Sequence, residues 1–301
     1  MFAIVCLSSC GPTPTEAPPF DADRAFGYLE TQVDFGPRTP DTEASAVARD
    51  YYYGHFSNLG MEVDSQVFDF FDPYSSTNMI LVNVIAHYVD PDANAMRICL
   101  MAHYDCRPRA EYAVDSTLRD TPIDGANDGA SGVAILMELA NMVATNPPGC
   151  HVDFVLVDGE DWGEPGDIQY YMLGSKHFAQ SNIRDRYRFG IVVDMVGDSG
   201  QQIYREGFSN MYNEALTDLV WNTAASLGVT TFHDSVKYTI YDDHLSLITA
   251  GVPTIDIIDF DYPFWHTESD TPDKCSPLAL DNVGRVLGHV IYNSSSWPPK
   301  R

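Results

Sequence analysis

The sequence predicts an α/β fold, a single domain built on a mostly parallel, twisted central sheet flanked by helices. Short β-branched apolar runs alternate with helix-forming segments along most of the chain, a pattern typical of parallel sheets covered by helices. Several of the runs have the length of buried strands and end in a histidine or a carboxylate. The 301 residues and 45% hydrophobic content suffice for one large core and do not require a second domain.

The expected elements follow in order. Helices are expected over 21–30 and 42–59. Two strands near 67–71 and 78–86 should open the sheet as antiparallel neighbours. The remaining expected elements alternate strand and helix, over 96–102, 131–144, 152–158, 173–181, 189–196, 211–227, 252–258 and 278–293. Between them, residues 107–122 form a long polar stretch without regular structure, which we expect to be the rim or lid of a site.

Charge restricts the partners of this chain. The 43 Asp and Glu against 17 Lys and Arg give a formal net charge of −26 at pH 7. Nucleic acids and anionic lipid surfaces require a basic surface that this composition does not supply. A peptide with a positively charged amino terminus would be attracted. No run of 18 apolar residues occurs, so no transmembrane helix is expected.

We expect residues 1–20 to be a signal and spacer, and residues 21–301 to be the catalytic domain. Leu7-Ser-Ser-Cys10 resembles the lipobox of bacterial lipoproteins, and a Pro/Thr-rich stretch follows it. The resemblance implies a lipid anchor at Cys10 and a location in the periplasm or cell envelope of a bacterium. A terminus without a lipid is the alternative, because no Lys or Arg precedes the apolar stretch.

Polar residues at the ends of the predicted strands indicate a metal site. His103, Asp161 and Asp194 each follow an apolar run, and His266 lies past the last one. Asp128 lies in a glycine-rich turn before an apolar helix. Because the carboxyl ends of parallel strands meet at one edge of a sheet, these residues should converge there. Histidine nitrogen and carboxylate oxygen are ligands that zinc favours.

Glu160 directly precedes Asp161 in this series. On a loop that leaves a strand, two adjacent side chains point apart, so one readily binds a metal while the other faces the substrate. This arrangement suits a metal ligand next to a general base. A solvated loop residue or a helix cap is the ordinary interpretation of any single carboxylate. Five such positions in series are much harder to attribute to chance.

The chain also resembles the zinc-dependent aminopeptidase superfamily, which includes the type II glutaminyl-peptide cyclotransferases. The motifs that carry the resemblance are His103-Tyr-Asp105, Asp128-Gly, Glu160-Asp161, Leu173-Gly-Ser175, Asp194 and His266. They span roughly residues 30–295 in the family's order and spacing. Two further segments are similar to the cyclases rather than the peptidases, namely Tyr241-Asp242-Asp243-His244 and Trp265-His266-Thr267.

This resemblance implies an enzyme that converts the amino-terminal glutamine of a peptide to pyroglutamate and releases ammonia. Its partners would be peptides or proteins that begin with Gln. The resemblance implies Asp128, Asp161 and His266 as the ligands of one zinc ion per chain. Glu160 would be the residue that transfers protons between the substrate amine and the leaving ammonia.

The resemblance also implies roles around the metal. Asp194 and Asp242 would form a hydrogen-bonded acid network, and Trp265 would wall the substrate pocket. A second indole found in animal cyclases has no clear counterpart here, and Tyr170 or Tyr171 is expected in its place.

Two alternatives stay open. In a dinuclear zinc aminopeptidase, His103 and Asp194 would bind a second metal, and a bridging water would attack the peptide bond. With one metal, His103 would instead lie behind the ligands. A non-catalytic peptide-binding lipoprotein is the remote alternative, since degeneration would normally remove a ligand or the base and neither is missing. The product from a Gln-initiated peptide separates the three: pyroglutamate with ammonia, free glutamine, or neither.

Overall fold

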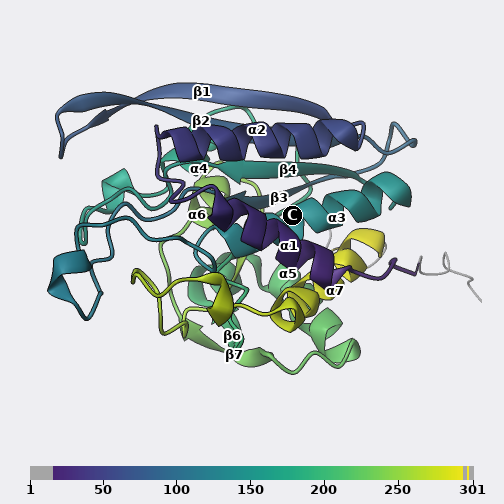
Figure 1. Cartoon of the computed structure of the whole chain (residues 1–301). Coiled ribbons are helices and arrows are strands. Elements are labelled where there is room, and N and C mark those ends of the chain that lie inside the picture. The colour runs from purple at the N-terminus through teal and green to yellow at the C-terminus, as the bar shows by residue number, and fades with distance from the viewer. Residues whose placement is uncertain (1–15, 294–296, 298–301) are drawn as a thin grey trace, which may run out of the picture.

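The computed structural model describes residues 16–293 and residue 297. Cys10, the expected lipid-attachment residue, lies outside these residues. Within the described ranges, no helix is both long and apolar enough to cross a bilayer. The described chain builds a central sheet with helices on both of its faces (Figure 1).

Six strands form the main sheet, in the spatial order β1-β2-β4-β3-β5-β8. They are β1 (Glu62–Asp72), β2 (Thr77–Tyr88), β3 (Arg97–His103), β4 (His151–Val157), β5 (Gly190–Asp194) and β8 (Thr254–Ile258). β1 and β2 are antiparallel, as are β2 and β4. β4, β3, β5 and β8 are parallel to one another. The predicted α/β sheet, with its antiparallel opening, is therefore confirmed.

Side chains of the central strands alternate between two buried layers. In β3, Leu100 and Ala102 belong to the larger core cluster, whereas Cys99 and Met101 belong to a smaller cluster on the opposite face. All four are fully buried. Burial on both faces explains why these strands appear in the sequence as continuous apolar runs.

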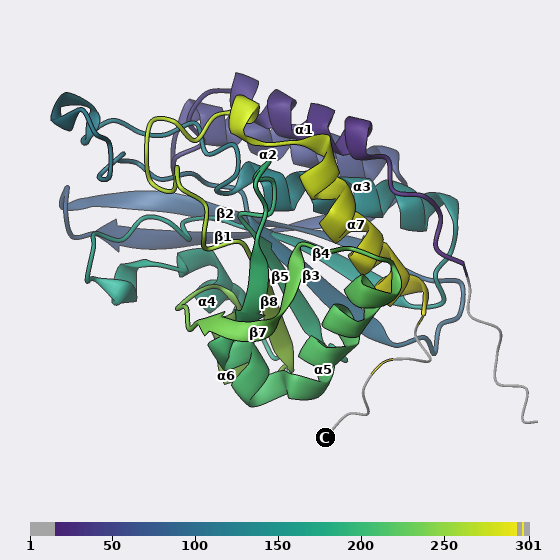
Figure 2. The same ribbon diagram turned by 90° about the horizontal axis from the view of Figure 1, so that it is seen from below.

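Helices cover both faces of the sheet (Figures 1 and 2). The larger core cluster includes residues of α1 (Ala22–Asp34), α2 (Glu43–Asn58), α3 (Ala130–Thr145), α5 (Gly207–Ser226) and α7 (Pro277–Tyr292). The smaller cluster includes residues of α4 (Leu173–Ala179) and α6 (His244–Thr249). The sequence did not predict α6 or the small parallel sheet of β6 (Ile203–Glu206) and β7 (Phe232–Tyr238).

Two glycines allow α3 to begin against the sheet edge. Gly129 is the N-cap of α3 and has a φ of 101°, which lies in the left-handed region. A Cβ atom on Gly132 would lie 2.2 Å from the carbonyl oxygen of Val193 in β5. This close approach holds Asp128, just before the helix, near the carboxyl ends of the strands.

The 107–122 loop differs from the polar, structureless segment that the sequence predicts. It contains a short 3₁₀ turn at Ser116–Leu118. Arg107, Ala110 and Ala113 are fully buried. The Arg107 guanidinium donates a 2.7 Å hydrogen bond to the carbonyl oxygen of Asp161, which ties the loop to the strand-end residues.

Candidate active site

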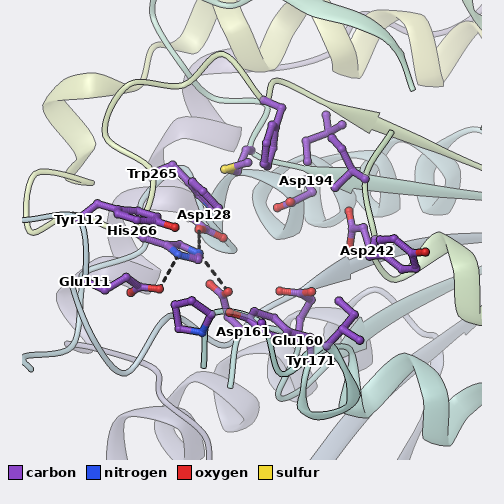
Figure 3. Close-up of a pocket in the computed structure, with 18 residues that line it drawn as sticks. Glu111, Tyr112, Asp128, Glu160, Asp161, Tyr171, Asp194, Asp242, Trp265 and His266 are labelled. Atoms are coloured by element: carbon purple, nitrogen blue, oxygen red, sulfur yellow. Dashed lines mark hydrogen bonds and ion pairs between the residues drawn. The ribbon is translucent and has the colours of Figure 1, made fainter. Parts of the chain in front are cut away.

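The five residues predicted from strand ends converge at the carboxyl edge of the sheet. His103 ends β3 and Asp194 ends β5, while Asp161 follows β4 and His266 follows β8 along a longer loop. Asp128 precedes α3. All five are buried. Figure 3 shows four of them, all except His103, around one pocket.

Asp128, Asp161 and His266 form a compact donor set. Nε2 of His266 lies 3.2 Å from Oδ1 of Asp161 and 3.7 Å from Oδ2 of Asp128 (Figure 3). The potential ligand atoms of the three residues lie within 4.8 Å of one another. Within the described residues, Oδ2 of Asp128 and Oδ2 of Asp161 are buried without a hydrogen-bond partner. Buried unpaired carboxylate oxygens are costly, and they fit a divalent cation.

A second donor set shares Asp128 with the first. Nε2 of His103 lies 3.2 Å from Oδ1 of Asp128 and 3.0 Å from Oδ1 of Asp194. The potential ligand atoms of these three residues also lie within 4.8 Å of one another. The cluster therefore contains the donors of a two-metal site with a bridging carboxylate. Geometry alone is compatible with one metal or two.

Two fully buried carboxylates accept hydrogen bonds from the backbone of the turns that carry Asp161 and Asp128. Asp105 accepts hydrogen bonds from the amides of Glu160 at 3.1 Å and Asp161 at 3.2 Å. Asp270 accepts one from the amide of Asp128 at 3.1 Å. Sequence reasoning noticed Asp105 within a motif but missed Asp270, which is distant along the chain from the turn that it supports.

Glu111 is a second residue that sequence reasoning missed. Its Oε1 lies 3.1 Å from Nδ1 of His266, and it also accepts hydrogen bonds from Arg107. Against the effect of burial, these two partners lower the pKa of Glu111 to about 2. An ionised Glu111 keeps the proton of His266 on Nδ1, so that Nε2 faces Asp128 and Asp161. The only signal in the sequence was its position in the expected rim loop.

Without a metal, His266 and Asp161 stabilise each other's charged form. Burial opposes the charge on His266, but Asp161 and Glu111 raise its pKa to about 9. His266 and Arg107 in turn lower the pKa of Asp161 despite its burial. Burial and the charge of Asp161 raise the pKa of Asp128 to about 7. A cation would therefore compete with protons for this cluster.

Glu160 lines the pocket next to Asp161, on the side away from His266. Figure 3 shows its carboxylate between those of Asp161 and Asp242. Burial and the charges of these two neighbours raise the pKa of Glu160 well above its ordinary value. A carboxylate whose pKa is raised toward the range in which it can both accept and donate a proton is suited to general acid–base chemistry.

Asp194 and Asp242 lie on the same wall of the pocket (Figure 3). Burial raises the pKa of Asp194, and Asp242 adds to this effect. The hydrogen bond of Asp194 goes to His103, at 3.0 Å. Asp242 has Asp256 as a further buried acidic neighbour, and burial together with the charge of Asp242 raises the pKa of Asp256 well above its ordinary value. Asp194 and Asp242 interact through charge, and the hydrogen-bonded network expected between them stays a prediction.

Aromatic side chains bound the pocket, which has a volume of about 320 Å³. The ring centroids of Trp265 and His266 are 3.9 Å apart, and Tyr112 stacks on His266 with an interplanar angle of 10°. Two tyrosines were expected as alternatives for the second aromatic wall. Tyr171 lines the pocket, whereas Tyr170 is not among the described residues that line it.

Comparison with known proteins identifies the family. The model of peptidase family M28 matches residues 83–291, which is more than half of the chain. The chain belongs to this family. The match contains all five converging residues together with Glu160 and Asp242.

Solved M28-like structures share this fold along nearly their whole length. A leucine aminopeptidase precursor from Bacteroides thetaiotaomicron is 37% identical, with a TM-score of 0.87, over 92% of this chain and 99% of that one. A glutaminyl cyclase from the same organism is 36% identical, with the same TM-score and coverage. The glutaminyl cyclase of Tannerella forsythia is 35% identical, with a TM-score of 0.86, again over 92% and 99%. By sequence, the chain spans about half the length of the first curated relatives it matches, 46% and 52%.

Proposed function

We propose that this chain is a zinc-dependent glutaminyl-peptide cyclotransferase, which converts an amino-terminal glutamine to pyroglutamate with release of ammonia. The observation that carries the proposal is a small pocket where the Asp128, Asp161 and His266 donor set adjoins Glu160 and Asp242. Similarity to several bacterial glutaminyl cyclases supports it.

Asp128, Asp161 and His266 would hold one zinc ion per chain, with their converging oxygens and Nε2 as ligands. When bound, the zinc ion polarises the γ-carbonyl group of the substrate glutamine. Three protein ligands leave a coordination position for the substrate, as in other catalytic zinc sites.

Glu160 transfers the proton in this reaction. The α-amine of a peptide has a pKa of about 7.7–8.0, so it arrives largely protonated and needs a base. Glu160 accepts one proton, and the freed amine nitrogen forms a bond to the side-chain carbonyl carbon, Cδ. The ring nitrogen then loses its second excess proton, and Glu160 returns a proton to the amide nitrogen. The bond from Cδ to that nitrogen breaks, ammonia leaves, and the one remaining proton passes to the ammonia or to solvent. Because ring closure is intramolecular, the pocket mainly orients the glutamine.

The aromatic wall restricts what enters. Trp265 and Tyr171 line the pocket beside the proposed reaction centre. Flat apolar side chains at this position exclude water, which would otherwise compete with the α-amine for the polarised carbonyl. This favours cyclisation over hydrolysis of the glutamine amide.

A product assay tests the proposal. The zinc-loaded protein is incubated with Gln-Gly-amide and with Leu-Gly-amide, and pyroglutamate, ammonia and free amino acids are quantified. We expect pyroglutamate and equimolar ammonia from the first peptide, little cleavage of the second, and about one zinc per chain by elemental analysis. Free glutamine, free leucine or no product at all would each overturn it.

A dinuclear aminopeptidase is the second candidate, favoured by the donor set His103, Asp128 and Asp194. If Asp194 binds no metal, Asp194→Asn should leave the zinc content nearly unchanged. Asp242→Ser, which removes a carboxylate from the pocket wall, should impair cyclisation. Two tightly bound zinc ions, one of them lost in Asp194→Asn, together with rapid hydrolysis of Leu-Gly-amide would establish the peptidase.

We also propose that the protein is lipid-anchored at Cys10 in a bacterial cell envelope, on the strength of the Leu7-Ser-Ser-Cys10 motif alone. Several acyl chains anchor a protein firmly, whereas one holds it weakly. Expressed in a bacterium, the full chain should fractionate with membranes, and Cys10→Ser should release it. Equal release of both forms would contradict the anchor.

A further inference from the structure

A second hollow lies directly beside the pocket, between α4 and α6. Its volume is about 610 Å³. The described residues that line it are Ile168, Gln169, Met172, Lys176, Ala179, Gln180, Tyr241, Leu245, Ser246, Thr249 and Ala250. We call it the α4/α6 groove. The two helices lie side by side in both views of the molecule (Figures 1 and 2).

The α4/α6 groove is continuous with the active-site pocket. Ile168 and Tyr241 line both hollows, so these two side chains form a shared rim. Both are large apolar residues with high exposure, 46% for Ile168 and 61% for Tyr241. A bound peptide that leaves the pocket over this rim enters the groove directly.

Hydrogen bonds fix the walls of the groove. Nζ of Lys176 donates to the carbonyl oxygens of Ile168 at 3.2 Å, Gln169 at 3.1 Å and Tyr171 at 2.6 Å, which holds the rim segment against α4. The hydroxyl groups of Ser175 and Ser246 join α4 to α6 at 2.9 Å. The groove is therefore formed before any ligand arrives, and binding does not have to order it.

The chemistry of the active site sets the direction in which a peptide leaves. The γ-carbonyl of the substrate must point toward Asp128, Asp161 and His266, whereas its α-amine must reach Glu160. Figure 3 shows Glu160 and Asp242 together on the opposite side of the pocket from His266. The α-carbon bears both the amine and the rest of the peptide, so the chain leaves on the Asp242 side, where Tyr241 forms the rim.

The residues that line the groove determine which peptide side chains can bind there. The pocket is walled by acidic residues, but none of the described residues lining the groove is acidic, although the chain has a net charge of −26. Its apolar surface comes from residues such as Met172, Ala179, Leu245 and Ala250. Side chains without charge gain from burial there. Lys176 is the one cation among the described lining residues, and its Nζ is directed to three backbone carbonyl oxygens, so a carboxylate would lose hydration in exchange for a contact with an ammonium group that already has partners.

We infer that the α4/α6 groove binds the part of a peptide substrate that follows its amino-terminal glutamine, and that it favours apolar side chains at the third and fourth residues. The inference rests on the proposed cyclotransferase function and deepens it, since it assigns a substrate class. Glutamine fills the pocket, the second residue crosses the Ile168 and Tyr241 rim, and the next two residues lie between the helices.

Three peptides test the substrate preference: Gln-Gly-amide, Gln-Gly-Leu-Phe-amide and Gln-Gly-Asp-Asp-amide. The zinc-loaded full chain should cyclise all three with similar kcat. The KM of the apolar tetrapeptide should be at least about tenfold lower than that of Gln-Gly-amide, the order of effect that apolar groups have in a preformed pocket. The acidic tetrapeptide should show no such gain.

Filling the groove should abolish this preference. Ala179 is a half-buried alanine at the end of α4, and Ala144 is a half-buried alanine near the end of α3 on the opposite face of the sheet. Ala179→Trp should bring the KM of Gln-Gly-Leu-Phe-amide close to that of Gln-Gly-amide, so that the ratio of the two KM values is close to one. Ala144→Trp, the matched control, should keep the ratio. Thr249→Trp, at an exposed position of α6, provides an independent variant.

The outcomes separate this inference from the proposed function. If Gln-Gly-amide yields no pyroglutamate, both fail. If Gln-Gly-amide is cyclised but all three peptides have the same KM, only the groove assignment fails. The assignment also fails if Ala179→Trp and Thr249→Trp both fold and both preserve the tenfold ratio.

Discussion

Glu160 and Asp161 are adjacent in the chain, yet their surroundings differ. Asp161 lies against His266, at 3.2 Å, and its pKa is lowered. Glu160 is surrounded by acidic neighbours, and its pKa is raised well above its ordinary value. Opposite shifts in two neighbouring carboxylates are characteristic of a site that divides charge binding from proton transfer.

This difference predicts the effects of removing each function. Glu160→Gln should retain zinc but lose about 10²–10⁴-fold in kcat, because the amide cannot accept or return a proton. Zinc content and turnover are measured on the same sample. Glu164→Gln, an exposed residue of the same loop, is the control and should behave like the unmodified protein. Near-normal turnover of Glu160→Gln would remove Glu160 from the mechanism.

Glu111 offers a second prediction for a single residue. By holding Nδ1 of His266 at 3.1 Å, it presents Nε2 to the donor set. Glu111→Gln should weaken zinc affinity about 10–100-fold, the usual effect of losing a carboxylate that orients a metal-binding histidine. Competition with a chelator of known affinity measures it, with the exposed Glu30→Gln as the control. An unchanged zinc affinity would mean that Glu111 only anchors its loop.

At the residue scale, the sequence revealed the groups that follow strands but not those that support them. His103, Asp161 and Asp194 were identified because an apolar run precedes each one. Glu111 and Asp270 lie in loops, and their partners are distant in sequence. Only the folded chain brings Glu111 to His266 and Asp270 to the turn before α3.

At the element scale, the predicted helices and strands share strong periodicity or continuous apolar runs, and those that were missed have neither. β7 has no buried residue, so its sequence carries no alternation of buried and exposed positions. It is a strand because it pairs with β6. α6 has six residues, too few to show a helical period.

The contact of α3 with β5 is the element-scale feature that places Asp128. Gly132→Ala should destabilise the protein by about 1–3 kcal/mol, since its new methyl group would meet the Val193 carbonyl oxygen. Gly54→Ala in α2 is the matched control, because nothing lies within 4 Å of the added Cβ. It should be stabilising by about 0.5–1 kcal/mol through helix propensity. Urea denaturation of both variants measures the difference, and equal effects would rule out the close contact.

At the scale of the whole molecule, an acidic chain buries many of its carboxylates, and several of these lie together at the candidate active site. Burial raises the pKa of Asp128, Asp158 and Asp259 to about 7 each. The pKa of His266 is raised to about 9 by its acidic neighbours. The folded protein without metal therefore holds protons that the unfolded chain releases at lower pH, which links stability, pH and metal binding.

The sign of this linkage gives a prediction for the metal-free protein. For a carboxylate with a raised folded pKa, the stabilising contribution is fully present below about pH 4 and is lost as the pH rises through about 7. The contribution of His266 is present below about pH 6.5 and is lost as the pH rises through about 9. Chelator-treated protein should therefore be more stable at pH 5.5 than at pH 8, by at least about 2 kcal/mol.

Zinc should oppose this trend, because it replaces the protons that Asp128 and His266 lose. Zinc at about 1,000 times its Kd stabilises a folded protein by about 4 kcal/mol, and its affinity rises with pH as its ligands deprotonate. Unfolding in urea at pH 5.5 and pH 8, with and without zinc, measures both effects. If the metal-free protein were equally stable at both pH values, the buried acids would not carry the protons that their surroundings indicate. If zinc stabilised the protein equally at pH 5.5 and pH 8, protons would not be competing with the ion for the donor set.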